Sequence, residues 1–379
     1  MPHLHKSEPS PAIANEPNST SSRVYKSDNT NNDNSFISHI TTKRISAPSL
    51  TMAIPSTQKA ILQPDKMSTS VNIISDHPIP TPDFAADEHL IRVHATAITN
   101  GELLWSRYFP LPAGSTKVLV PCNDVAGTVI AAPQLSPFQP GTEVYARSSY
   151  ARTGCARAYT ILLSEEMAER PQCLSWAESA AVPMSAETSW QALFVQAGLE
   201  ARKGSADGKR VFVTAASGGA GVWMVQLAKW AGAEVIGTCS TANVQLVRSL
   251  GADVVLDYTE TDVKQWAAEN DKPADLIIDC IGGKALEDAW WVVKEGGTLL
   301  SIFQPPEEKK PVGAPADVRN FFFVMATSGE QLRKITPLVE DGMRPALDSV
   351  VPFDEYQRAF EKLASGRTKG KIVLDLMAH

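Results

Sequence analysis

A glycine-rich segment in the middle of the chain combines residue types that suit the binding of a phosphate-bearing ligand. An apolar stretch beginning at Val211 runs into Ala215-Ala-Ser-Gly-Gly-Ala-Gly221, and an amphipathic pattern follows. Glycines permit a tight turn and let the backbone approach a pyrophosphate without a Cβ in the way. The amino terminus of the following helix adds N–H donors and the positive end of its dipole. The segment therefore predicts a dinucleotide site, with contacts expected at Ala216, Ser217, Gly218, Gly219, Ala220, Gly221 and Val222.

The end of the next strand indicates which dinucleotide to expect. A protein that prefers NAD places Asp or Glu about 20 residues after the glycines to bind the ribose 2′-hydroxyl. Here the strand runs into Cys239-Ser-Thr-Ala-Asn243, which contains no acid, and Arg248 follows. Hydroxyl and amide groups accept a 2′-phosphate that a carboxylate would repel. We therefore expect NADPH, bound by Ser240 and Asn243 with Tyr258 on the adenine, although Ser240 also suits a helix N-cap.

The elements around this segment alternate between strand and helix. A glycine cluster alone also fits an ordinary tight turn, so this context decides the interpretation. Alternating units predict a doubly wound parallel sheet of the Rossmann type, covered by helices on both faces. The expected strands are 210–215, 234–238, 253–257, 275–279 and 297–302, and the expected helices are 219–231, 241–250, 260–268 and 284–293.

The flanking regions have a different pattern. Short β-rich stretches punctuated by Pro and Gly predict a compact β-barrel-like domain before residue 165, and residues 175–198 are helical in pattern. A strand at 321–324, helices at 329–340 and 353–364 and a strand at 371–376 are expected after the parallel sheet. The stretches expected in the barrel are 58–62, 71–75, 90–97, 124–131, 143–147 and 158–163.

Composition limits the classes of protein and partner. The 379 residues suit two domains, and 43% hydrophobic with 20% charged residues suits a soluble globular protein. A net charge of −7 argues against a nucleic-acid partner, and the lack of a long apolar run or signal peptide argues against a membrane protein or a secreted one. Five isolated cysteines form no CxxC pair, which indicates a reduced cytoplasmic protein without a disulfide framework.

The first 52 residues are rich in Ser, Thr, Asn and Pro, with few large apolar side chains. Such a segment buries too little apolar surface to offset its chain entropy, so we expect a disordered extension over 1–52. Because order is expected to begin near Met52, that methionine is an alternative natural start. A transit peptide is a further alternative, against which the acidic residues of the segment weigh.

Several motifs along residues 56–378 together resemble the medium-chain dehydrogenase/reductase superfamily. Within it, the chain is most similar to the zinc-less quinone oxidoreductase-like branch and to fungal trans-acting enoyl reductases. Besides the glycine-rich segment, the motifs are VPCNDVAGTV (120–129), PGTEVY (140–145), AAVPMSAETSWQAL (180–193), LGADVVLDY (250–258), DCIGG (279–283) and GRTKGKIVL (366–374).

The resemblance implies a domain organisation. It places a GroES-like catalytic domain at 53–183, a Rossmann NADPH-binding domain at 184–324 and a return to the catalytic domain at 325–379, with the active site between the domains. It also implies a homodimer. The resemblance adds cofactor contacts at Thr188, Ile281, Gly282, Ile302, Phe303 and Lys371.

The chain departs from the zinc-dependent members of this superfamily. Those relatives place a cysteine ligand where this chain has Thr99-Asn100-Gly101, and a histidine ligand where it has Asn123. Neither replacement is a sound zinc ligand. We therefore expect no metal, and no Lewis-acid polarisation of an alcohol.

The chemistry left without a metal is hydride transfer to a carbon that is already electrophilic, as in an enone or a quinone. Asn100 is the first candidate to hydrogen-bond the acceptor's oxygen, and its alternative role is to satisfy a buried turn. Tyr108 and Tyr150 are candidate proton donors, although water also suffices. Apolar walls of the substrate pocket are expected from Trp105, Phe109, Phe322 and Phe323.

The leading hypothesis from the sequence is an NADPH-dependent reductase of an enone, an enoyl group or a quinone, with a small molecule as substrate and a place in secondary metabolite biosynthesis. An NADP-dependent alcohol or ketone dehydrogenase is the second reading. The third is a sensor or scaffold that binds NADPH without turnover. The identity of the substrate stays open at this point.

Overall fold

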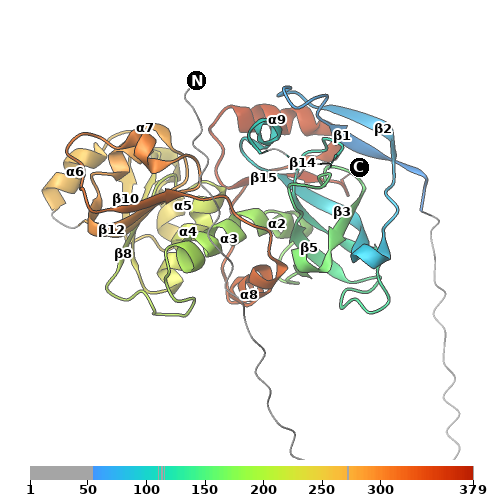
Figure 1. Ribbon diagram of the computed structural model, residues 1–379, viewed down its shortest axis with the longest axis horizontal. Coiled ribbons are helices and arrows are strands. Elements are labelled where there is room, and N and C mark those ends of the chain that lie inside the picture. Colours follow the sequence, from blue (N-terminus) through green and yellow to red (C-terminus); the bar gives the residue numbers. More distant parts are fainter. Residues whose placement is uncertain (1–53, 110, 112–113, 115, 271–272, 379) are drawn as a thin grey trace, which may run out of the picture. The chain divides into compact units, whose positions relative to one another are not determined.

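The computed structural model describes residues 54–109, 111, 114, 116–270 and 273–378. Residues 54–379 cluster as one unit. The expected extension over 1–52 lies outside the described residues. Within the part described, the strands form a six-stranded sheet, a seven-stranded sheet and a short two-stranded ribbon of β1 (Thr57–Leu62) and β2 (Asn72–Pro78) (Figure 1).

The six-stranded sheet is parallel throughout, in the order β10-β9-β8-β11-β12-β13. This is the strand order of a doubly wound dinucleotide-binding sheet, with the topological switch point between β8 and β11. Its strands are β8 (Arg210–Val213), β9 (Glu234–Cys239), β10 (Val254–Asp257), β11 (Ala274–Asp279), β12 (Val293–Ser301) and β13 (Arg319–Phe322). Its helices are α4 (Gly219–Trp230), α5 (Val244–Ser249), α6 (Val263–Asn270) and α7 (Gly283–Ala289).

Alternate residues of this sheet enter different hydrophobic cores. Val211 and Val213 of β8 pack with α3 (Pro183–Trp190) and α4, whereas Phe212 between them packs with α6 and α7. Because successive side chains of a strand point to opposite faces, both faces of the sheet are covered. The fold class expected from the alternating pattern is confirmed.

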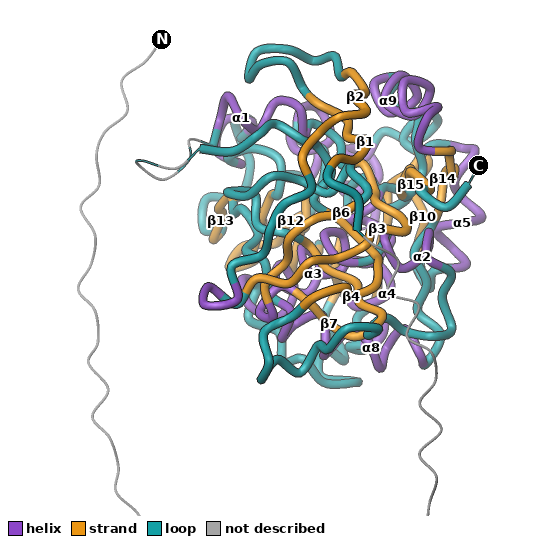
Figure 2. The backbone as a smooth tube through the Cα atoms, turned by 90° about the vertical axis from the view of Figure 1, so that its right-hand side faces the viewer, coloured by secondary structure: helices purple, strands orange, loops and turns teal. Residues whose placement is uncertain are grey.

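The seven-stranded sheet joins segments from both ends of the chain, in the order β14-β15-β3-β4-β5-β7, with β6 pairing β3. All its pairs are antiparallel except β14 with β15. Figure 2 shows helix α9 (Tyr356–Ala364) beside β14 and β15, which it contacts. The strands are β3 (Glu88–Ile98), β4 (Asp124–Ala131), β5 (Glu143–Arg147), β6 (Tyr159–Leu163), β7 (Met167–Glu169), β14 (Leu347–Pro352) and β15 (Lys371–Asp375).

The helical stretch expected over 175–198 is interrupted. It divides into α2 (Trp176–Ala180), α3 (Pro183–Trp190) and a π-helical turn over Gln191–Gln196. Pro183 starts α3 because proline lacks an N–H and suits the first turn of a helix, not its interior. Strands β7 and β14 were not expected, and the helix expected to reach residue 293 ends at Ala289.

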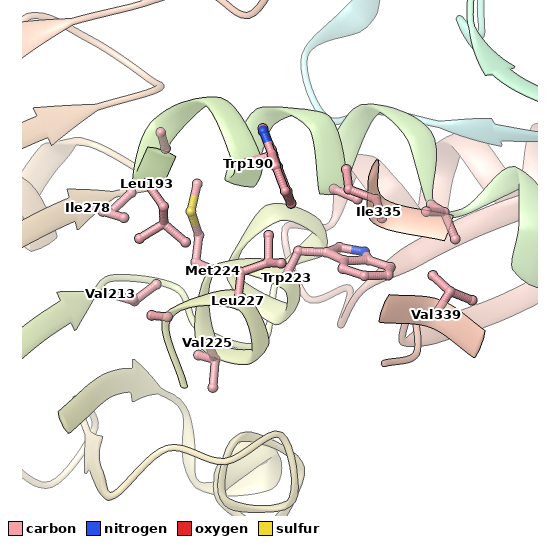
Figure 3. Close-up of a cluster of buried hydrophobic side chains, with 14 of the residues drawn as sticks. Trp190, Leu193, Val213, Trp223, Met224, Val225, Leu227, Ile278, Ile335 and Val339 are labelled. Carbon is pink, nitrogen blue, oxygen red and sulfur yellow. The ribbon is translucent and has the colours of Figure 1, made fainter. Parts of the chain in front are cut away.

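A single core connects the two large sheets. Trp190 and Leu193 pack against Trp223 and Leu227 of α4, and Ile335 and Val339 of α8 (Gly329–Glu340) complete the cluster (Figure 3). The same cluster includes Ala95 and Ala126 of the antiparallel sheet. The parallel and antiparallel sheets therefore share buried apolar contacts. Among the described residues, no helix is long and apolar enough to cross a membrane.

Candidate functional site

The glycine-rich turn joins the carboxyl end of β8 to the amino end of α4. Ala215 has φ 48°, and it is the residue of the turn, rather than a glycine, that adopts the left-handed conformation. A Cβ on Gly221 would lie 2.3 Å from the carbonyl oxygen of Ala215. Glycine is therefore needed there for close packing of the helix on the turn. The N–H of Gly218 donates to the carbonyl of Ala215 at 2.8 Å, so the main-chain N–H groups of the first turn of α4, from Gly219 onward, are the ones suited to a pyrophosphate.

A buried carboxylate organises the neighbouring strand ends. Asp279 ends β11 with no exposed surface, and it accepts hydrogen bonds from the hydroxyls of Thr214 and Ser301, both at 2.7 Å. The N–H of Gly282 also donates to it, at 2.9 Å. Asp279 thereby ties together the ends of β8, β11 and β12 at the switch point. Asp279 is the first residue of the DCIGG motif, and no role for it was expected from the sequence.

Large apolar side chains stay exposed just after the ends of three strands, β10, β11 and β12. Tyr258 after β10 is 59% exposed, Ile281 after β11 is 47% exposed and Phe303 after β12 is 55% exposed. In parallel α/β sheets, ligands bind outside the carboxyl ends of the strands. These residues, with Gly282 and the half-buried Ile302 between them, lie on the side of the sheet where a dinucleotide is expected.

Ser240 and Asn243 lie next to each other after β9. The amide of Asn243 donates to the hydroxyl of Ser240 at 3.3 Å, and its main-chain N–H donates to the Ser240 carbonyl at 2.8 Å. Ser240 takes the N-cap position of a short 3-10 turn over Thr241–Asn243, without a side-chain capping bond. The hydroxyl is thus not used to cap the turn. Its contact with a 2′-phosphate stays a prediction.

The closing segment of the chain lies against the glycine-rich turn. The N–H of Gly370 donates to the carbonyl of Ser217 at 2.7 Å. Next to it, Lys371 forms an ion pair with Asp124 at 2.9 Å and donates to the hydroxyl of Thr99 at 2.8 Å. Both charged side chains are buried, with 6% and 0% exposed. The predicted contact of Lys371 with cofactor phosphate stays a prediction, and the structure gives its ammonium a carboxylate partner.

The remaining residues that were predicted to contact the cofactor differ in how deeply they are buried. Thr188 is buried, and its hydroxyl donates to the carbonyl of Met184 one turn earlier, at 2.6 Å. Ala216 and Val222 are buried in or beside the core, and Ala220 is half-buried. Thr188, Ala216 and Val222 are thus buried, while the half-buried Gly218, Gly219 and Ala220 form the more open side of the turn.

The candidates for acceptor chemistry separate in the structure. Asn100 is exposed, and no hydrogen bond of its side chain is found within the described residues, whereas the preceding Thr99 contacts Lys371. Tyr108 is 68% exposed. Tyr150 is half-buried, and its hydroxyl donates to the carbonyl of Phe109 at 2.9 Å. Of the three, Tyr150 alone lines an internal pocket.

That narrow pocket has aromatic, aliphatic and polar walls, and of the predicted wall residues Trp105 lines it whereas Phe109 does not. Trp105 and Phe109 both lie edge-on to the ring of Tyr150, with centroids 6.1 Å apart in each case. The predicted wall residues Phe322 and Phe323 lie elsewhere, on β13 and directly after it, and Phe323 packs in the shared core. The polar groups that line the pocket are Gln63, Glu102, Ser106, Lys117, Asn123 and Tyr150.

Glu102 connects this pocket to the buried ion pair. It is 8% exposed, and the main-chain N–H of Cys122 donates to it at 3.2 Å. Burial raises the pKa of Glu102 to about 8, against a smaller opposing effect of the Lys371 charge. The carboxyl group is therefore mostly protonated at neutral pH.

Comparisons with known proteins agree with this architecture. A family model described as zinc-binding dehydrogenase matches residues 250–374. A protein of Arthroderma benhamiae named probable zinc-binding oxidoreductase, mitochondrial, is 47% identical over 86% of this chain and 98% of its own length. The chain belongs to the medium-chain dehydrogenase/reductase superfamily.

Further members of the superfamily indicate the class of reaction. An Arabidopsis thaliana protein named NADPH-dependent alkenal/one oxidoreductase, chloroplastic, is 29% identical over 85% of this chain and 80% of its own length. The solved quinone oxidoreductase from Coxiella burnetii superposes with a TM-score of 0.67 at 25% identity, covering 84% of this chain and 99% of that one. The chain is an oxidoreductase of this superfamily, and its relatives support a nicotinamide cofactor.

The zinc named in some members of the superfamily does not fit the residues of this site. Thr99 accepts a hydrogen bond from the Lys371 ammonium, a cation where a metal would have to bind. The amide nitrogen of Asn123 donates to the Ser148 hydroxyl at 3.0 Å, and an amide is a poor ligand for zinc compared with the histidine that zinc-dependent members place there. Within the described ranges, no group of three or more His, Cys, Asp and Glu side chains is placed to hold a metal ion.

Sequence reasoning missed the residues that depend on tertiary contacts. Asp279, Asp124 and Lys117 are charged side chains that the fold buries or half-buries, and the pairing of the predicted residue Lys371 with Asp124 was not expected. Asp124 and Asp279 stood inside quoted motifs, and a charge at the end of an apolar strand was the available signal. Lys117 had no such signal, because it lies in a loop of mixed composition.

Proposed function

We propose that this oxidoreductase reduces activated C=C bonds or quinones with NADPH and without zinc. The observation that carries the proposal is the ammonium of Lys371 at Thr99, where a metal-dependent member would place a ligand. A site without a Lewis acid favours acceptors that are already electrophilic. The name of the Arabidopsis relative, an alkenal/one oxidoreductase, supports the same class of acceptor.

Different residues of the chain would bind the cofactor and the acceptor. The glycine-rich turn and the first turn of α4 would hold the pyrophosphate, with Tyr258 and Ile281 along the nucleotide. When bound, the nicotinamide supplies the hydride. The barrel side, by which we mean the seven-stranded sheet and the pocket with Trp105 and Tyr150, would orient the acceptor and exclude water from it.

The proposal of NADPH over NADH rests on the end of β9. Ser240 and Asn243 offer a hydroxyl and an amide there, and the segment 239–243 contains no carboxylate that would repel a 2′-phosphate. The printed name of the Arabidopsis relative specifies NADPH. We propose the same cofactor for this chain.

The test is a set of assays that follow NADPH absorbance in buffer treated with a chelator. Enones, alkenals and quinones are the acceptors, and NADH replaces NADPH in a parallel series. We expect NADPH oxidation with at least one of these classes and no change on adding zinc. Strict dependence on zinc, or reversible oxidation of simple alcohols with NADP⁺, would support a dehydrogenase instead. Tight NADPH binding with no turnover of any acceptor would support a sensor or scaffold.

The compartment and assembly are also proposals. We propose a cytoplasmic homodimer that acts on a small-molecule substrate, whereas the printed name of the Arthroderma relative specifies mitochondria. Fractionation of cells expressing the full chain tests the compartment. Light scattering of the purified protein tests the dimer.

A further inference from the structure

A half-buried lysine on the wall of the narrow pocket has no part in the function described so far. The ammonium of Lys117 donates to the carbonyl of Tyr150 at 2.5 Å and lies 3.7 Å from the centre of the Tyr150 ring. An ammonium has three donors. No carboxylate within the described residues forms an ion pair with it. The group therefore has donor capacity left for a ligand in the pocket.

The charge around Lys117 favours an anionic partner. Glu102 is the acid that lines the same pocket, and its carboxyl group is mostly protonated at neutral pH because burial raises its pKa to about 8. Arg147 is the other charged group that acts on Lys117. The pocket thus presents a cation at neutral pH, with no ionised carboxylate opposite it.

Burial also brings Lys117 into the range where it can exchange a proton near neutral pH. Loss of hydration, with a smaller contribution from the nearby charge of Arg147, lowers the pKa of Lys117 to about 8, against a still smaller opposing effect of the Glu102 carboxyl. An acid is most effective when its pKa lies near the working pH. Tyr150, by contrast, already donates its hydroxyl proton to the Phe109 carbonyl.

We propose that Lys117 binds the oxygen of the acceptor and gives it the proton that completes reduction, an inference that rests on the proposed reductase function. The pocket is small, so it fits the oxygen end of an enone or quinone and not the whole carbon skeleton. In an enone, hydride reaches the β-carbon and the C=C electron pair shifts to leave a negative oxygen. An N–H bond of Lys117 then breaks as the O–H bond of the enol forms, and the neutral amine regains its proton from solvent.

The first experiment compares Lys117→Ala, Lys117→Arg and the surface control Lys203→Ala in NADPH oxidation with an accepted enone. We expect Lys117→Ala to lower kcat by about 100-fold, the size of a general-acid contribution. Lys117→Arg should retain part of the activity and lose the fall in rate above about pH 8, because guanidinium does not deprotonate. Added methylamine should restore part of the Lys117→Ala rate. Unchanged kcat and pH profile in both Lys117 variants would refute the proposal.

The second experiment needs no turnover and uses the wild-type full chain. Acetylation by a trace of acetic anhydride is followed at Lys117 and Lys203 by mass spectrometry across a pH series. Lys117 should react with a midpoint near 8, and a phenolate, as a stable mimic of the enolate oxygen, should protect Lys117 but not Lys203. A midpoint near the ordinary lysine value of about 10.4, without protection, would overturn the inference.

The two proposals fail in different ways. A wild-type protein that reduces no enone or quinone refutes the reductase function, whatever the acetylation shows. An active wild-type protein whose Lys117 variants match it in kcat and pH profile refutes only the role of Lys117.

Discussion

At the carboxyl ends of β8 and β11, the site is made of main chain and small residues, whereas on the barrel side it is made of charged side chains. The nucleotide side depends on close approach, as at Gly221, and on a buried carboxylate, Asp279, that receives only neutral donors. The barrel side depends on the Asp124–Lys371 ion pair and on the half-buried Lys117.

This difference indicates which properties of the protein a substitution on each side can alter. A backbone cradle accepts any dinucleotide with a pyrophosphate, so selectivity there is left to a few residues such as Ser240. Side chains on the barrel side can alter charge and proton transfer without altering the fold of the turn. Substitutions on the two sides should therefore affect different measurements.

The largest effect is expected from Lys371→Met, which leaves the Asp124 carboxylate buried without its cation. Breaking a buried pair in this way costs about 3–5 kcal/mol of unfolding free energy. Urea unfolding followed by circular dichroism measures it. The double variant Asp124→Asn/Lys371→Met should recover part of the loss, because Asn keeps an acceptor for the N–H of Met184. A loss below about 1 kcal/mol in the single variant would mean that solvent replaces the pair.

The next effect is expected from Gly221→Val on the nucleotide side. A side chain at this position meets the carbonyl of Ala215, so α4 must move away from the turn. We expect NADPH binding to weaken by at least about 100-fold, or about 2.7 kcal/mol, in a fluorescence titration.

Gly208→Ala is the matched control for Gly221→Val. Gly208 has φ 78° with open space around its Cβ position, so the substitution strains the backbone by about 1 kcal/mol without blocking the turn. It should bind NADPH normally. Equal binding by the Gly221 and Gly208 variants would show that the turn does not hold the cofactor.

On the barrel side, Glu102→Gln should alter how stability depends on pH. Because the pKa of Glu102 is raised to about 8 in the folded protein, the folded state holds a proton that the unfolded state releases above its ordinary value. The contribution of Glu102 to the free energy of unfolding is full at low pH and is lost as pH rises toward 8. The wild-type protein should lose about 1.4 kcal/mol per pH unit relative to the variant over this window. Parallel curves from urea unfolding would contradict the assignment.

The smallest effect is expected from Ser240→Asp, which adds a carboxylate where the 2′-phosphate is proposed to bind. The ratio of NADPH to NADH affinity should fall by about tenfold, or about 1.4 kcal/mol. Ser249→Asp adds the same charge at the other end of α5 and should leave the ratio unchanged. An unchanged ratio in Ser240→Asp would place recognition of the phosphate elsewhere.

Most of the parallel sheet could be predicted from the sequence, because each strand is a short apolar run followed by a helical pattern. The prediction failed where periodicity gives no signal: β7 is three residues long, and β14 has neither an alternating burial pattern nor a long apolar run. The glycine turn was located correctly, although its left-handed residue is Ala215. The expected contact of Phe322 and Phe323 with substrate stays a prediction, because aromatic type alone cannot distinguish a pocket wall from a core residue such as Phe323.

The sequence by itself determined the alternation of strands and helices, the position of the glycine-rich turn and the absence of an acid after β9. These features depend on local spacing and residue type. Only the tertiary structure decided that Lys371 from the end of the chain meets Asp124 and Thr99, and that Lys117 meets Tyr150. Such contacts join residues far apart in the chain, and the charge and proton affinity of each group follow from the burial that those contacts create.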